Sequence, residues 1–186
     1  EVNAKELLLN FIKKDSFDYA VSEIAPKHPV YKKLRQSLKI LDTFPEDDLK
    51  VIERFAKNDK CVAIGEIGLD YYWMESSKEE QKKFFKAQIE LAKKLDMPII
   101  VHDRDAHGDT LDIFRETKPK GVVHCFSGSK EMAREIIKLG MYIGLNGVVT
   151  FNNARKSLEV ATEIPIGRLV LETDCPYLAP APRGGG

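Results

Sequence analysis

The sequence predicts an α/β fold built on a parallel sheet of about five to six strands with helices between them. Apolar runs rich in Val, Ile and Leu recur along the second half of the chain. These runs lack a clean alternation of polar and apolar residues, as expected for strands buried on both faces. Amphipathic stretches separate them, and this repetition of strand and helix indicates a parallel sheet. The expected strands are Cys61–Ile67, Pro98–His102, Gly121–Phe126, Met141–Asn146 and Arg168–Thr173.

The expected helices of the second half carry start and stop signals. Ser77 followed by Glu80 forms a capping box before an apolar face. Ser129 can cap a second helix, because its hydroxyl can accept a hydrogen bond from a free N–H of the first turn. We expect a third helix to start at Asn152 and to end before Pro165, since the residue before a proline disfavours helical backbone.

The first part of the chain is expected to be helical. Residues 1–41 hold two amphipathic patterns, whose apolar faces are Leu7 with Phe11 and Leu34 with Leu38. Acidic residues 46–48 suit the positive N-terminal end of a further helix, which would bury Leu49, Ile52 and Phe55. No linker divides the chain, so the sequence predicts a single domain, residues 1–186, with a divergent helical segment at residues 1–41.

Composition narrows the class of protein. The 29 basic and 29 acidic residues give a formal net charge of zero, which argues against a protein that coats nucleic acid through bulk charge. Three cysteines without a Cys-x-x-Cys pair indicate a reducing compartment, and we expect a cytoplasmic protein. No apolar run is long enough to span a bilayer, so no membrane partner is expected. The chain starts without methionine and ends in three glycines, so we expect both ends to be cut.

Four potential metal ligands stand near the ends of expected strands: Glu66, His102, His124 and Asp174. In parallel α/β folds the C-terminal ends of the strands converge on the functional site, so these side chains should point into one mouth. Imidazoles combined with carboxylates suit Zn²⁺, Mn²⁺ or a similar divalent ion. Each residue taken alone also fits a structural role: a hydrogen-bonded histidine, a loop carboxylate at Glu66, or a turn-forming aspartate at Asp174.

Other features near the strand ends allow two interpretations. The aromatic residues Tyr71–Trp73 could stack on bases at the rim of a site or could cover the core. The stretch from His124 to Ser129, with Ser127 and Gly128, could bind a phosphate at a helix N-terminus or form a simple tight turn. Cys125 is expected to pack in the core, since alternation turns it away from His124.

Taken in order, these residues resemble the TatD deoxyribonuclease family from about Asp42 to Gly184. The matching stretches are Gly65–Trp73, Gln88–Ala92, Val101–Ala106, His124–Ser129, Tyr142–Gly144 through Thr150-Phe151, Leu171–Leu178 and Pro182–Gly184.

The resemblance implies a (β/α)₈ barrel that binds two divalent metals and hydrolyses DNA. By resemblance Glu66 would bridge the ions, and His102 and His124 would hold one of them. Asp174 would hold the other ion and act on the attacking water, so Glu66 and Asp174 are the expected catalytic residues. Arg104 and Arg183 are similar to residues that contact substrate phosphates.

The chain also departs from the family pattern. The family opens with a His-x-His strand end that supplies partners for the Asp174 metal, and no His-x-His occurs here. The family's His-Pro-His motif has only His28-Pro29 as a counterpart, in unrelated surroundings. We therefore expect a partial TIM barrel with one or two ions of Zn, Mg or Mn. Open sheet edges would favour a homodimer.

Three functions stay open on this basis. The first is a metal-dependent deoxyribonuclease weakened by its incomplete metal site. The second is an inactive truncated or rearranged TatD-like domain. The third is a metal-dependent hydrolase of a small molecule.

Overall fold

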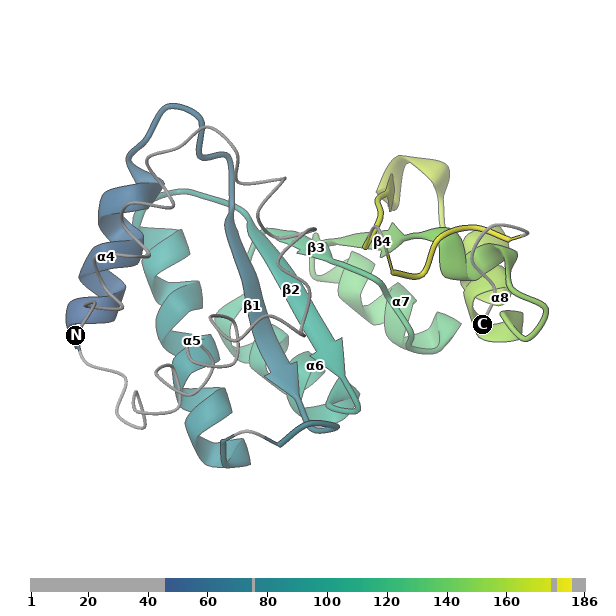
Figure 1. The fold of residues 1–186 in the computed structure, drawn as a ribbon, viewed down its shortest axis with the longest axis horizontal. Helices are drawn as coiled ribbons and strands as arrows, with labels where there is room; N and C mark the ends of the chain where they lie inside the picture. Colours follow the sequence, from purple (N-terminus) through teal and green to yellow (C-terminus); the bar gives the residue numbers. More distant parts are fainter. Residues whose placement is uncertain (1–45, 75, 175–176, 182–186) are drawn as a thin grey trace, which may run out of the picture. The chain divides into compact units, whose positions relative to one another are not determined.

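The computed structural model describes residues 46–74, 76–174 and 177–181, and residues 46–186 form a compact unit of their own. A five-stranded parallel sheet runs through this unit in the order β1-β2-β3-β4-β5 (Figure 1). The parallel α/β fold expected from the sequence is thus confirmed. Its strands are β1 (Ile64–Asp70), β2 (Ile99–Arg104), β3 (Gly121–Val123), β4 (Tyr142–Leu145) and β5 (Leu169–Leu171).

One helix precedes the first described strand, and further helices connect the strands. They are α4 (Glu46–Ala56), α5 (Lys78–Lys94), α6 (His107–Thr117), α7 (Lys130–Lys138) and α8 (Arg155–Glu163), with short 3-10 turns η1 (Gly147–Thr150) and η2 (Ile166–Arg168). The capping box of α5 is present: the Ser77 hydroxyl accepts from the Glu80 N–H, and the Glu80 carboxylate accepts from the Ser77 N–H. Ser129 caps α7 by accepting from the Met132 N–H at 3.3 Å. The helices expected in residues 1–41 lie outside the described residues.

The start of α8 differs from the expectation. The helix begins at Arg155 rather than at Asn152, and its cap position, Ala154, makes no side-chain hydrogen bond. The reason is a turn in which the Ala154 N–H donates to the Phe151 carbonyl and the Arg155 N–H donates to the Asn153 carbonyl. Asn152 and Asn153 therefore lie in this turn, and the helical hydrogen bonds begin after them.

The core lies between the sheet and the helices that pack on it. Helix α5 packs against β1, α6 against β2 and α7 against β4. Phe85 of α5 and Phe114 of α6 are both fully buried, with ring centroids 6.1 Å apart in an edge-to-face arrangement. Leu49 and Ile52 of α4 pack against this core, but Phe55, which was expected to be buried, is 37% exposed.

The pairing of β1 with β2 positions the candidate site. β1 begins and ends three residues later than expected, at Ile64 and Asp70 instead of Cys61 and Ile67. In register, Gly68 lies beside His102, and the pairing is irregular between Ile64 and Ile67. A Cβ on Gly68 would meet the His102 carbonyl oxygen at 1.9 Å, so glycine is what allows the two strands this close approach.

Strands β1 and β5 are the edges of the sheet within the described residues. On the β5 side, Ile166 and Leu171 are each 86% exposed. No helix in the described part of the chain is long and apolar enough to cross a membrane.

Candidate metal centre

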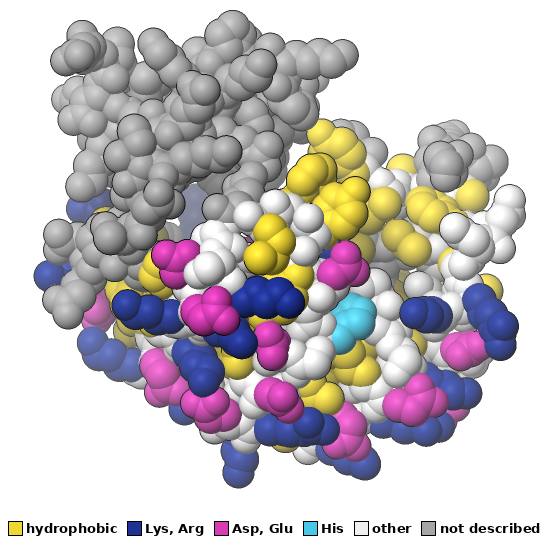
Figure 2. Space-filling view, turned by 90° about the horizontal axis from the view of Figure 1, so that it is seen from below, with side chains coloured by type: hydrophobic (Ala, Val, Ile, Leu, Met, Phe, Trp, Pro, Cys, Tyr) yellow, Lys and Arg dark blue, Asp and Glu magenta, His cyan; other side chains and the backbone are white. Residues whose placement is uncertain are grey.

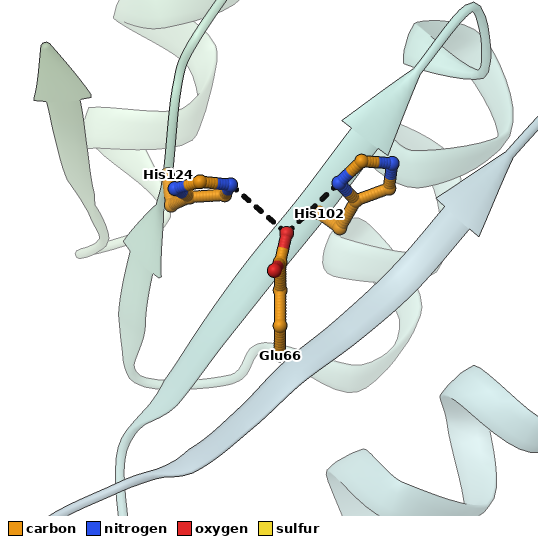
Figure 3. A group of neighbouring side chains, drawn as sticks. All are labelled: Glu66, His102 and His124. Carbon is orange, nitrogen blue, oxygen red and sulfur yellow. Dashed lines mark hydrogen bonds and ion pairs between the residues drawn. The ribbon is translucent and has the colours of Figure 1, made fainter. Parts of the chain in front are cut away.

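Three of the expected ligands come from three neighbouring strands and lie close together (Figure 3). Glu66 belongs to β1, His102 to β2, and His124 follows the last residue of β3. The Glu66 Oε1 lies 2.8 Å from His102 Nδ1 and 2.9 Å from His124 Nε2, so one carboxylate oxygen joins both imidazoles. The structure thus brings these three residues together, and their role as ligands stays a prediction.

The separations in this cluster fit a small divalent ion. Its three ligand atoms lie within 4.8 Å of one another. Ligands on a tetrahedral Zn²⁺ at about 2.1 Å would be separated by roughly 3.4 Å. The two N···O contacts of 2.8 and 2.9 Å therefore need to open by only about half an ångström to admit such an ion. The Glu66 side chain is 45% exposed and that of His102 is 33% exposed, which leaves an approach from solvent.

The outer nitrogen of each imidazole faces a second carboxylate. His102 Nε2 lies 3.1 Å from Asp70 Oδ2, and His124 Nδ1 lies 3.1 Å from Glu172 Oε2. Such partners fix the tautomer and the orientation of a metal-binding imidazole. Sequence reasoning assigned a role to neither Asp70 nor Glu172. The available signal was the position of each within two to four residues of an expected ligand, Glu66 and Asp174, at a strand end.

Asp174 stands on the other side of His124 from Glu66. Its Oδ1 lies 3.6 Å from His124 Nδ1. With Glu172 these residues form a second group whose ligand atoms lie within 4.8 Å of one another. The structure therefore places all four expected ligands in one region, with His124 between Glu66 and Asp174.

The carboxylates and imidazoles of the cluster shift one another's protonation. Hydrogen bonds from His102 and His124 lower the pKa of Glu66 to about 2. Glu66 first, and Glu172 with it, raise the pKa of His124 to about 9 against the opposing effect of burial. Glu66 and Asp70 raise the pKa of His102 as well. In the metal-free protein at neutral pH, His124 therefore carries a proton that an incoming ion must displace.

The residues expected to contact phosphate are placed as follows. The Arg104 guanidinium lies over the Tyr72 ring, with its carbon 4.1 Å from the ring centroid. Ser127 is exposed. Gly128 is a packing glycine, since a Cβ there would meet the Phe126 ring at 2.6 Å, and this favours the tight-turn interpretation. Arg183 lies outside the described residues, and the phosphate-binding roles stay predictions.

Cys125 was expected to pack in the core, but the structure places it outside the core. It is half-buried in the turn after β3, where its φ of 45° ends the strand earlier than predicted. The Asn146 side chain donates to its Sγ at 3.0 Å, and its own N–H donates to Glu172 Oε1 at 3.2 Å. Burial raises the pKa of this thiol to about 11, so it stays neutral near pH 7. A neutral thiol is a poor ligand and a poor nucleophile.

Comparison with known proteins agrees with this geometry. The family model described as TatD related DNase matches residues 11–185. The chain therefore belongs to the TatD-related DNase family. The match begins well before Asp42, where the resemblance was expected to start, so the family relationship reaches further toward the N-terminus than the motifs indicated.

Two relatives illustrate the similarity. The chain is 49% identical over 143 residues to a metal-dependent hydrolase of Bacillus subtilis named YabD, covering 75% of this chain and 56% of that protein. It is 44% identical over 141 residues to the metal-dependent hydrolase YcfH of Escherichia coli, covering 74% and 53% respectively. The chain is thus similar to metal-dependent hydrolases of this family, and it spans about half the length of these two relatives.

Solved structures show the same relationship in space. The TatD homologue YJJV of Escherichia coli superposes with a TM-score of 0.66 at 33% identity, covering 72% of this chain and 53% of that one. A TatD-family hydrolase of Entamoeba histolytica gives a TM-score of 0.63 at 36% identity, covering 77% and 48%.

Proposed function

We propose that this protein is a divalent-metal-dependent hydrolase that cleaves phosphodiester bonds of DNA. The observation that carries the proposal is the single oxygen of Glu66 held between Nδ1 of His102 and Nε2 of His124. One carboxylate and two imidazoles from three adjacent strands form a compact donor set for Zn²⁺ or Mn²⁺. The family match supports hydrolysis, and the family's description supports DNA as the substrate.

In the proposed hydrolysis, a bound ion and the side chains of the protein would have different roles. A bound divalent ion lowers the pKa of its water and stabilises charge on the phosphoryl group. Glu66, His102 and His124 would hold that ion, while Asp70 and Glu172 hold the two imidazoles in orientation. Asp174, whose Oδ1 lies 3.6 Å from His124 Nδ1, would accept a proton from an attacking water.

The described residues favour one tightly held ion rather than two. The second group, formed by His124, Glu172 and Asp174, uses the same imidazole as the first. Holding an ion at Nε2 and another at Nδ1 would require a fully deprotonated ring. A lone ion cannot stabilise the attacking and the leaving oxygen together, so we propose slow cleavage.

A labelled oligonucleotide tests the proposal directly. The full chain, loaded with Zn²⁺ or with Mn²⁺, is incubated with DNA and the products are separated by size. We expect slow cleavage that a chelator stops and that Glu66→Gln abolishes. His107→Gln is the matched control, because His107 pairs with Asp103 away from the cluster and should leave cleavage intact.

Two results would contradict the proposal. Metal binding without cleavage of DNA would indicate an inactive domain. Cleavage of small phosphate esters but not of DNA would indicate a small-molecule hydrolase on the same site.

A further inference from the structure

Two aromatic side chains stand exposed directly after β1. Tyr72 is 56% exposed and Trp73 is 61% exposed, and their rings meet edge to face with centroids 4.9 Å apart. The Arg104 guanidinium, at the end of β2, lies 4.1 Å from the Tyr72 ring centroid and 5.8 Å from that of Trp73. We call these three residues the aromatic cluster.

The aromatic cluster is tied to the candidate metal centre through one carboxylate. Asp70 Oδ1 accepts from the backbone N–H groups of both Tyr72 and Trp73 at 2.9 Å, while Oδ2 lies 3.1 Å from His102 Nε2. Asp70 also pairs in register with Arg104 across β1 and β2. The cluster is therefore held beside the His102 side of the metal centre.

The exposed rings of Tyr72 and Trp73 lie next to a polar site. Tyr and Trp rings normally bury much of their area, and exposed aromatic surface next to a polar site marks a place of binding. Within the described residues Arg104 forms no ion pair, so its N–H groups stay available while its flat face covers Tyr72. Flat rings beside an unpaired guanidinium form the surface on which nucleobases stack in single-strand binding proteins.

The charge distribution favours short-range contacts with a nucleic-acid strand over long-range electrostatic attraction. Figure 2 shows acidic and basic side chains interspersed over the visible face, with hydrophobic side chains between them. A formal net charge of zero gives little long-range attraction for a polyanion. Affinity for a nucleic-acid strand must then come from short-range contacts near the site, and stacking is one that needs no net charge.

We propose that Tyr72, Trp73 and Arg104 form a stacking subsite for an unpaired nucleobase of the strand whose phosphodiester reaches the metal centre. This inference rests on the proposed function, because it needs a nucleic-acid substrate. A base inside a duplex presents its edges but not its faces, so only an unpaired base can stack on this cluster.

Trp73 is the one tryptophan of the chain, so its fluorescence reports on this position alone. The full chain is titrated, with a chelator present to prevent cleavage, with a short thymidine oligonucleotide and with an abasic strand of equal length. We expect quenching by the oligonucleotide and little by the abasic strand, since both carry phosphates but only one carries bases. Equal quenching by the two strands, or none by either, would overturn the inference.

Variants give an independent measurement by anisotropy of a labelled oligonucleotide. Trp73→Ala should weaken binding about tenfold, in the range measured for the loss of one stacked base. Trp73→Phe should restore most of it, because a ring remains. The matched control is Tyr142→Ala, which removes another exposed tyrosine under an arginine, 5.0 Å from Arg168, at the opposite end of the strands.

The two proposals can fail separately. If Trp73→Ala binds the strand as the parent does while Glu66→Gln loses cleavage, the subsite is wrong and the function stands. If quenching depends on bases but no DNA is cleaved, the subsite stands and the function falls. Equal weakening by Tyr142→Ala would also overturn the subsite.

Discussion

Asp70 holds His102 with one carboxylate oxygen and the backbone of Tyr72 and Trp73 with the other. If His102 coordinates an ion through Nδ1, its Nε2 carries the proton and donates to Asp70. The carboxylate thus selects the coordinating tautomer and at the same time orders the turn after β1.

Replacing Asp70 with Asn should weaken metal binding 10- to 100-fold, the usual cost of losing an outer partner of a ligand. The amide oxygen can keep the two N–H groups of the turn, which leaves an NH₂ group facing His102 Nε2. That favours the tautomer with a proton on Nδ1, which cannot coordinate. Competition with a chromophoric chelator for Zn²⁺ measures the change.

Asp103→Asn is the control for this prediction. Asp103 forms the same kind of contact with His107, at 2.9 Å, but outside the cluster. Equal zinc affinity in the Asp70 variant and the parent would show that Asp70 does not set the tautomer.

Removing a ligand should have an effect at least as large. We expect His102→Ala to lower Zn²⁺ affinity by an order of magnitude or more, because a direct ligand should cost no less than an outer partner. Isothermal titration of the variant beside His107→Ala checks this. Unchanged binding by His102→Ala would mean that the ion is held elsewhere.

Metal binding should release protons and strengthen as pH rises. The raised pKa of His124, about 9, means that an ion competes with a proton throughout the neutral range. Apparent affinity should therefore increase up to about pH 9, by as much as tenfold per pH unit for one displaced proton. Titrations in buffers with different ionisation enthalpies count the protons, and an affinity independent of pH between 6.5 and 9 would contradict the prediction.

The stability of the metal-free protein should change in the opposite direction. The pKa of His124 in the folded chain is raised above the ordinary histidine value of 6.5, so its contribution to stability is complete below pH 6.5 and is lost as pH rises through about 9. Thermal unfolding with a chelator should therefore show a falling melting temperature over this window. His124→Gln should flatten that dependence.

The β5 edge predicts self-association. Ile166 and Leu171 are each 86% exposed beside a strand with an open edge in the described residues. Unpaired edges and exposed apolar residues favour pairing with another chain, so we expect a homodimer. Leu171→Lys should shift sedimentation equilibrium toward the monomer, whereas Leu158→Lys, on α8, should do so less. A parent that stays monomeric at high concentration would rule the dimer out.

The architecture could be predicted from the sequence because short apolar runs and helix-capping residues indicate its strands and helices. Five apolar runs separated by capped helices were enough to indicate the parallel sheet, and the capping box at Ser77 is present as expected. Boundaries were less accurate. Asn152 looks like a helix start, but backbone hydrogen bonds of the preceding turn move the start to Arg155.

Part of the candidate site could also be predicted from the sequence, and part could not. Glu66, His102, His124 and Asp174 could be found because side chains at strand ends converge. Asp70 and Glu172 could not be assigned, because an outer partner is defined by a distance to an imidazole nitrogen and not by a sequence pattern. Arg104 was expected at a phosphate, whereas its contact with the Tyr72 ring appears only in three dimensions.

The three-residue cluster of Glu66, His102 and His124 has a topological consequence. Each residue comes from a separate strand-helix unit, and Glu66 and His102 alone are 36 positions apart. An ion bound there would cross-link three consecutive units and close the loops between them, much as a covalent bridge would. Ligand that binds only the folded chain adds about 2.7 kcal/mol at 100 times its dissociation constant. Metal supply would thus raise the free energy of unfolding of the chain even where no substrate is present.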